Sequence, residues 1–113
     1  MAKIAVVEDN DAMREQLCGF IAQYARESGR QLDVTAFADG AEIVDPYRPG
    51  FDIIFLDIEM PTLGGMPTAE RIRQVDPDVV LVFVTNMAQY AIRGYEVDAL
   101  DFVLKPVSYY QFS

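Results

Sequence analysis

The 113-residue chain contains no histidine and only one cysteine, Cys18. Without histidine it cannot supply a Ser-His-Asp triad, a histidine-ligated zinc site or a phosphohistidine donor. A single thiol cannot form an intramolecular disulfide, which fits a reducing compartment, and we expect the protein in the cytoplasm. These absences exclude large classes of hydrolases, zinc proteins and disulfide-stabilised secreted domains.

Positive charge and long apolar runs are also scarce. Nine Lys and Arg stand against eighteen Asp and Glu, for a net charge of −9. Because phosphate binding needs positive surface, we expect this segment to bind no nucleic acid. The longest apolar runs, such as residues 79–84, are too short to cross a bilayer, and the N-terminus lacks a signal-peptide pattern, so we expect no membrane association. An acidic cluster can instead hold a hard cation.

Short apolar runs alternate with segments of helical period, and the 51% apolar content supports one core. The pattern predicts strands at residues 4–7, 32–36, 51–57, 79–84 and 102–104, and helices over 13–24, 39–47, 69–75 and 88–95. In the third helix Ala69, Ile72 and Val75 are expected to face the core. Strands that alternate with helices imply an α/β fold, a doubly wound parallel sheet with helices on both faces.

Polar residues stand at the ends of four predicted strands. Glu8 and Asp9 follow the first strand, and Asp57 ends the third. Thr85 ends the fourth strand, and Lys105 follows the fifth. Because ligands in such sheets bind beyond the carboxyl ends of the strands, we expect these side chains to meet in one crevice. Three crowded carboxylates repel one another unless a cation joins them, and Mg²⁺ with oxygen ligands is the simplest solution.

The same groups suit phosphoryl transfer. A carboxylate can take a phosphoryl group as a mixed anhydride, and Asp57 is the best candidate nucleophile because it ends a continuous apolar strand. A cation, an ammonium and a hydroxyl can stabilise the equatorial oxygens. Each residue taken singly also has an ordinary structural role, as a helix cap, a turn residue or a solvated surface charge. Their joint position at four strand ends favours the functional interpretation.

In these residues the chain resembles the receiver domains of bacterial response regulators, the CheY-like family, over essentially its whole length. The segments that carry the resemblance are residues 4–9, 57–61 with Gly65, 82–85 and 104–107. Residues 86–102 are further similar to receivers that precede LytTR-type DNA-binding domains. The resemblance implies a flavodoxin-like (βα)5 fold with a five-stranded parallel sheet in the order 2-1-3-4-5.

The resemblance also implies roles for individual residues in a two-component phosphorelay. Asp57 accepts a phosphoryl group from the phosphohistidine of a sensor histidine kinase. Glu8 and Asp9 hold Mg²⁺ together with Asp57 and the backbone carbonyl of Glu59. The protein then acts as a phosphoacceptor signalling domain that catalyses only its own phosphorylation and dephosphorylation.

Three further residues take part in the switch that the resemblance implies. The Thr85 hydroxyl and the Lys105 ammonium bind the phosphoryl group beside Asp57. Phe102 occupies the position of the family's switch aromatic, usually a tyrosine, and turns inward when Thr85 moves. Phosphorylation thereby changes the surface that controls an attached output domain.

The chain stops where the family's last helix begins. We therefore interpret residues 1–113 as a receiver domain truncated at its C-terminus, with the last helix largely missing and the output domain absent. The resemblance implies that this output domain binds DNA and regulates transcription. The uncovered docking surface of the last helix predicts lowered stability and self-association as a homodimer.

Two alternatives from other classes remain open. A small aspartyl-phosphate hydrolase would use Asp57 on an external substrate, with Glu59 as the second acid two residues on, but the chain leaves no cap to enclose a substrate. A flavodoxin-like cofactor binder needs a glycine-rich phosphate loop after the first strand, where the acidic residues 8–11 would repel a phosphate. Turnover of a generic phosphate ester, or a coloured purified protein, would distinguish them.

Overall fold

The computed structural model describes residues 2–85 and 101–104, with side chains for residues 2–84. The strands are β1 (Ala2–Val7), β2 (Leu32–Phe37), β3 (Ile53–Leu56), β4 (Val80–Thr85) and β5 (Asp101–Leu104). The helices are α1 (Asp11–Ser28), α2 (Gly40–Val44) and α3 (Gly65–Val75). None of the helices in these ranges is both long and apolar enough to cross a membrane.

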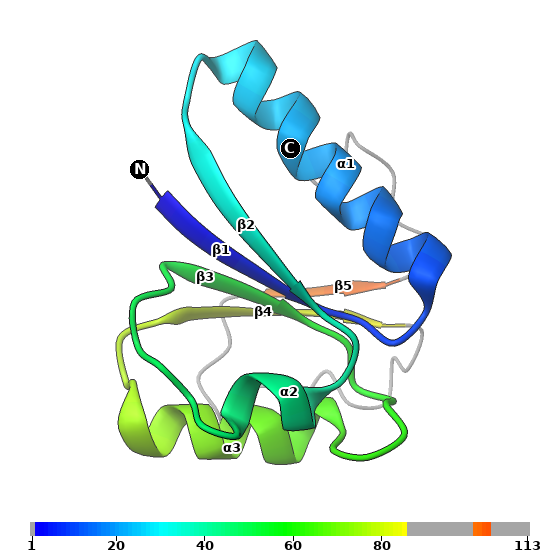
Figure 1. Cartoon of the computed structure of the whole chain (residues 1–113), viewed down its shortest axis with the longest axis vertical. Helices are drawn as coiled ribbons and strands as arrows, with labels where there is room; N and C mark the ends of the chain where they lie inside the picture. Colours follow the sequence, from blue (N-terminus) through cyan, green and yellow to red (C-terminus); the bar gives the residue numbers. More distant parts are fainter. Residues whose placement is uncertain (1, 86–100, 105–113) are drawn as a thin grey trace.

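The five strands form one parallel sheet in the order β2-β1-β3-β4-β5. Helix α1 lies on one face of this sheet, and α2 and α3 lie side by side on the other (Figure 1). The predicted α/β fold and strand order are therefore confirmed. The predicted helix over 88–95 and the last helix lie outside the described residues.

Strand β1 is an interior strand whose side chains pack into both hydrophobic cores. Ile4 and Val6 pack into the cluster under α1, whereas Ala5 and Val7 pack into the cluster under α2 and α3. All four are buried, as expected for a central parallel strand covered on both faces. The carboxyl end of β1 is consequently fixed from both sides of the sheet.

Local signals at the ends of α1 match the predicted helix. The side chain of Asn10 accepts a hydrogen bond from the backbone N–H of Met13 at 2.9 Å, which caps the N-terminus. Gly29 ends the helix with φ 70°, a left-handed conformation that glycine adopts without strain. The cap fixes the direction in which the chain leaves β1.

Two helix predictions need correction. Helix α2 ends at Val44 rather than at residue 47, because Asp45 precedes Pro46 and a residue before proline is driven out of helical geometry. Val75 is 56% exposed whereas Ile72 is fully buried, so the prediction that Val75 faces the core is wrong. Val75 is the last residue of α3, and Asp76 leaves helical geometry with φ −136° and ψ 84°.

The C-terminal ends of α2 and α3 are joined by a side-chain hydrogen bond. The hydroxyl of Tyr47, just beyond α2, donates to Oδ2 of Asp76, just beyond α3, at 2.7 Å. Burial and this bond raise the pKa of the Tyr47 hydroxyl above its usual range. The group therefore keeps its proton, and its role as donor, at neutral pH.

The contrast within α3 predicts two different stability effects. Replacing Ile72, which is 0% exposed, by Ala should lower the free energy of unfolding by about 2–5 kcal/mol. Val75→Ala on the same helix should change it by at most about 0.5 kcal/mol. Urea unfolding followed by circular dichroism measures both values, and equal losses in the two variants would contradict this assignment of the core.

Candidate functional site

The sheet itself positions two of the predicted carboxylates. The backbone N–H of Glu8 donates to the carbonyl of Phe37 at 3.0 Å, and that of Asp57 donates to the carbonyl of Val7 at 3.0 Å. Both bonds extend the parallel pairing one residue beyond the strand ends. Glu8 and Asp57 therefore stand next to each other at the carboxyl edge of the sheet.

The side chains of Glu8, Asp9 and Asp57 form a cluster of three carboxylates. One oxygen from each lies within 4.8 Å of the other two. Glu8 is 1% and Asp57 6% exposed, whereas Asp9 is exposed. Carboxylates at this spacing repel one another, most strongly between the buried Glu8 and Asp57, so the arrangement favours a bound cation.

The cluster opens onto a shallow depression of about 570 Å³. Its lining residues are Asp9, Asn10, Asp57, Ile58, Glu59, Met60 and Pro61. The depression is thus bordered by Asp9 from the loop after β1 and by Asp57 and Glu59 from the loop after β3. It lies at the carboxyl edge, where ligands of open α/β sheets bind.

A close backbone contact fixes the loop that follows Asp57. Its Oδ1 accepts a hydrogen bond from the backbone N–H of Ile58 at 2.8 Å, and the N–H of Gly65 donates to the Ile58 carbonyl at 2.8 Å. A Cβ at Gly65 would lie 2.2 Å from the Asp57 carbonyl oxygen. Only glycine therefore lets the first turn of α3 approach the Asp57 backbone this closely.

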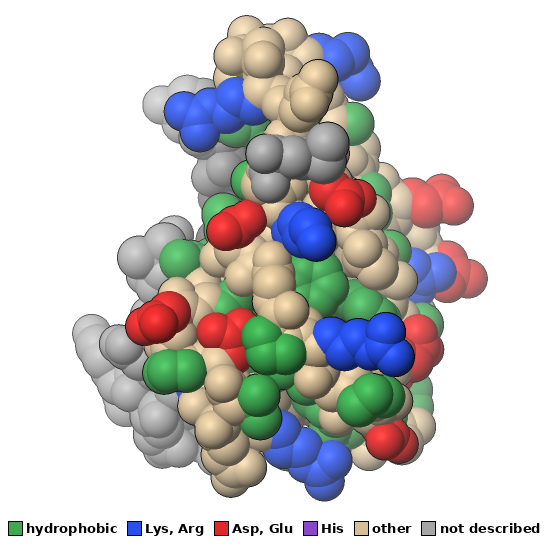
Figure 2. All heavy atoms as spheres, turned by 60° about the vertical axis from the view of Figure 1, so that its left-hand side comes forward, with side chains coloured by type: hydrophobic (Ala, Val, Ile, Leu, Met, Phe, Trp, Pro, Cys, Tyr) green, Lys and Arg blue, Asp and Glu red, His purple; other side chains and the backbone are tan. Residues whose placement is uncertain are grey.

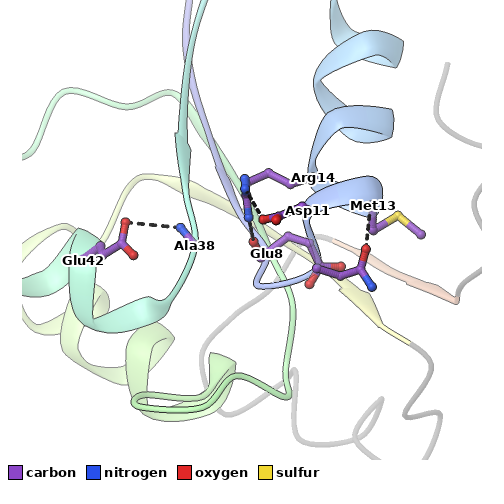
Figure 3. Close-up of polar contacts among 7 residues, drawn as sticks. Glu8, Asp11, Met13, Arg14, Ala38 and Glu42 are labelled. Carbon is purple, nitrogen blue, oxygen red and sulfur yellow. Dashed lines mark hydrogen bonds and ion pairs between the residues drawn. The ribbon is translucent and has the colours of Figure 1, made fainter.

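Arg14, which was not among the predicted site residues, fixes the loop between β1 and α1. Its Nη1 donates to the backbone carbonyl of Glu8 at 2.9 Å, and its Nη2 forms an ion pair with Asp11 at 2.5 Å (Figure 3). The spacing of Asp11 and Arg14, three residues apart on a helix, indicates the ion pair. Nothing in the sequence indicates the bond to Glu8.

The remaining predicted site residues are described only in part. Thr85 is the last residue of β4, paired with Leu104, and Phe102 pairs with Phe83. These positions put Thr85 at the same edge of the sheet as Asp57, because all strands are parallel. The side chains of Thr85 and Phe102, and all of Lys105, lie outside the described residues, so their roles stay predictions.

The donor set of the cluster suits Mg²⁺. This ion prefers carboxylate, carbonyl and water oxygens at about 2.0–2.1 Å, so that opposite ligands are about 4.2 Å apart. The three carboxylate oxygens, within 4.8 Å of one another, are close to that spacing. The residues present therefore fit the ion.

A second cavity, of about 460 Å³, carries no comparable cluster. Its charged lining residues are Lys3, Asp33, Glu42, Asp45 and Arg48, which are of both signs. Figure 2 likewise shows Lys and Arg side chains interspersed with Asp and Glu over the face that it presents. Among the described residues, the carboxylates at the sheet edge are thus the stronger candidate site.

Comparison with known proteins identifies the family. The response regulator receiver domain matches residues 4–112, and the chain belongs to this family. The chain is 32% identical over 108 residues to the sensory transduction protein LytT of Bacillus cereus, which covers 94% of this chain and 42% of that protein. It is 30% identical over 106 residues to the transcriptional regulatory protein YpdB of Escherichia coli, covering 92% of this chain and 41% of YpdB. The chain therefore spans less than half the length of these curated relatives.

Solved structures agree with this assignment. The non-phosphorylated HemR receiver domain from Leptospira biflexa superimposes with a TM-score of 0.85 at 30% identity, over 99% of this chain and 88% of that one. The response regulator TrrA from Thermotoga maritima, in complex with Mg²⁺ and BeF, gives a TM-score of 0.80 at 26% identity, over 99% and 93%. The resemblance to two-component receiver domains is confirmed, and the LytT relatives support the LytTR-type subfamily. Receiver domains bind Mg²⁺ at an acidic pocket, which agrees with the cluster.

The contact at Gly65 predicts a position-specific effect of adding one methyl group. Gly65→Ala places a Cβ against backbone atoms of Asp57 and Ile58, so it should lower the free energy of unfolding by about 1–3 kcal/mol. Gly19→Ala is the matched control, because this exposed position inside α1 has nothing within 4 Å, and it should raise stability by about 0.4–1 kcal/mol. Thermal melts of both variants measure the difference; a Gly65→Ala protein as stable as wild type would disprove the close contact.

Proposed function

We propose that this protein accepts a phosphoryl group on Asp57 from the phosphohistidine of a sensor histidine kinase, in a reaction that depends on Mg²⁺. The observation that carries the proposal is the convergence of Glu8, Asp9 and Asp57 within 4.8 Å. Family membership supports it, since the match covers residues 4–112. The proposed Mg²⁺ ligands are these three carboxylates and the backbone carbonyl of Glu59.

In the proposed transfer, a carboxylate oxygen of Asp57 attacks phosphorus while the bond to the donor nitrogen breaks, and its electron pair stays with the donor imidazole. The product is a mixed anhydride on Asp57. Mg²⁺, when bound, neutralises the charge of the phosphoryl oxygens. The bond from Ile58 N–H to Oδ1, at 2.8 Å, fixes the rotation of the Asp57 carboxylate, so that it faces the open depression in one orientation.

Thr85 and Lys105 complete the proposed site. We assign to the Thr85 hydroxyl and the Lys105 ammonium the binding of the phosphoryl group, and to Phe102 the switch aromatic. The position of Thr85 at the end of β4 supports this assignment, since β4 neighbours β3 in the sheet. Charge-assisted hydrogen bonds of about 1.5–3 kcal/mol each would favour the arrangement in which both groups face Asp57.

The domain is proposed to be the receiver part of a longer transcriptional regulator. It spans 42% of LytT, a sensory transduction protein, and 41% of YpdB, a transcriptional regulatory protein. We propose that the output domain of this regulator binds DNA. We propose that the regulator acts in the cytoplasm and responds to a sensor histidine kinase.

The first test is phosphorylation by a small acyl phosphate such as acetyl phosphate. With Mg²⁺ the protein should gain the mass of one phosphoryl group, and chelation of the metal should abolish the gain, because the donor set holds the ion that neutralises the transferred charge. Acid-quenched mass spectrometry measures the product. Asp57→Asn should remain unmodified, while Asp33→Asn, an exposed carboxylate on β2, should react like wild type; equal labelling of the Asp57 variant would refute the acceptor assignment.

A second test concerns the metal directly. Asp9→Asn removes one carboxylate of the cluster and should weaken Mg²⁺ binding by about tenfold or more, because even groups that only orient a metal ligand contribute about 10–100-fold. Glu15→Gln removes the same charge from an exposed position on α1 and should leave the affinity within about twofold, since exposed charges are screened. Calorimetric titration with MgCl₂ gives both constants, and the ligand set is wrong if the two variants bind alike.

A further inference from the structure

Asp39 is a buried carboxylate outside the acidic cluster, and it binds two separate segments of the chain. Its Oδ1 accepts hydrogen bonds from the backbone N–H of Ala41 and of Leu63, each at 2.9 Å. Its Oδ2 accepts from the N–H of Thr62 at 2.9 Å. The residue is only 9% exposed. One side chain thus connects the start of α2 to a loop more than twenty residues away.

That loop is the one that carries the proposed site. Residues 57–64 join β3 to α3, with Asp57 and Glu59 in their first half and Thr62 and Leu63 in their second. The first half is tied to the sheet through the Asp57 N–H. The second half is exposed at Thr62 and depends on Asp39 for the partners of two successive backbone N–H groups. The path of the loop past Glu59 is therefore set from α2.

The start of α2 and this loop are closely packed against each other. A Cβ at Gly40, next to Asp39, would lie 2.5 Å from the Leu63 carbonyl oxygen and would overlap Oγ1 of Thr68 at 1.9 Å. The Thr68 hydroxyl is itself buried and donates to the Gly64 carbonyl at 2.7 Å. Because these groups touch, the loop cannot relax toward α2 if the bonds from Asp39 are lost.

A helix cap alone does not explain the three bonds. Capping α2 needs one acceptor for the Ala41 N–H, whereas the other two bonds serve the loop. Burial by itself raises the pKa of Asp39, but the three backbone N–H bonds outweigh burial and hold the pKa below its usual value. The carboxylate is therefore charged at neutral pH and makes charge-assisted bonds.

We propose that Asp39 is a positioning residue for the Mg²⁺ site: by binding Thr62 and Leu63, it holds the β3–α3 loop in the shape that presents Asp57 and the Glu59 carbonyl to the ion. This inference rests on the proposed function. Asp39 touches neither the ion nor the phosphoryl group, and it acts only through the loop.

Asp39→Ser separates the two roles of this side chain. Serine caps helices as well as aspartate does, but its hydroxyl is too short to reach both loop N–H groups. We expect the variant to keep α2 and to bind Mg²⁺ about tenfold or more weakly, as for other residues that orient metal ligands. Calorimetric titration with MgCl₂ measures the affinity, and circular dichroism verifies the fold.

Phosphorylation kinetics provide a readout that a merely structural role would not change. With acetyl phosphate as donor, the Mg²⁺ concentration for half-maximal rate should rise in Asp39→Ser as the affinity falls. At saturating Mg²⁺ the rate should return to within about twofold of wild type, because the ion then drives the loop into its binding shape.

Two further variants complete the test. Asp39→Asn keeps one carbonyl acceptor but places an amide NH₂ opposite the Thr62 N–H, so its Mg²⁺ affinity should fall between those of wild type and Asp39→Ser. If the serine variant fails to fold, the Mg²⁺ affinity of Asp39→Asn tests the positioning role instead. Glu42→Gln removes the same charge from the first turn of α2, where the carboxylate accepts from Ala38 N–H at 3.3 Å (Figure 3), and should bind Mg²⁺ within about twofold of wild type.

The outcomes separate this inference from the function on which it rests. Asp39 variants that bind Mg²⁺ as tightly as wild type overturn the positioning role alone. A loss in Glu42→Gln equal to that in Asp39→Ser also overturns it, since net charge would then be the cause. A wild-type protein that binds no Mg²⁺ overturns the proposed function and the inference together.

Discussion

The mutual repulsion of three carboxylates is the constraint around which this fold is arranged. Glu8 and Asp57 cannot move apart, because each extends the backbone pairing of the sheet by one hydrogen bond. Both are almost fully buried, so water screens their charges poorly. The receiver family to which the chain belongs binds Mg²⁺ at an acidic pocket, and a cation of this kind relieves such repulsion.

Groups outside the cluster hold it in shape. Arg14, a cation, binds the backbone of the loop that carries Glu8 and Asp9, and Asp39, an anion, binds the backbone of the loop after Asp57. Both side chains are charged, and both form hydrogen bonds to main-chain groups of the loops that carry the cluster.

Much of the fold and part of the site could be predicted from the sequence. Parallel strands that are buried on both faces have continuous apolar sequences. The acidic residues follow directly after those sequences, so the positions of Glu8, Asp9 and Asp57 at the carboxyl edge of the sheet were predictable. Asp39 has the sequence signature of a helix cap, but its bonds to Thr62 and Leu63 join residues 23 and 24 positions apart and leave no local pattern. The exposure of Val75 was missed for a similar reason, since periodicity does not indicate where a helix runs past the core.

The hydrogen bond from Tyr47 to Asp76 has a mechanical consequence. It joins α2 and α3 at the ends remote from the acidic cluster, while the contact of Gly40 with Thr68 joins them at the near ends. Contacts at both ends oppose movement of one helix relative to the other. Helices α2 and α3 are therefore held together at both ends and pack against the sheet as one unit.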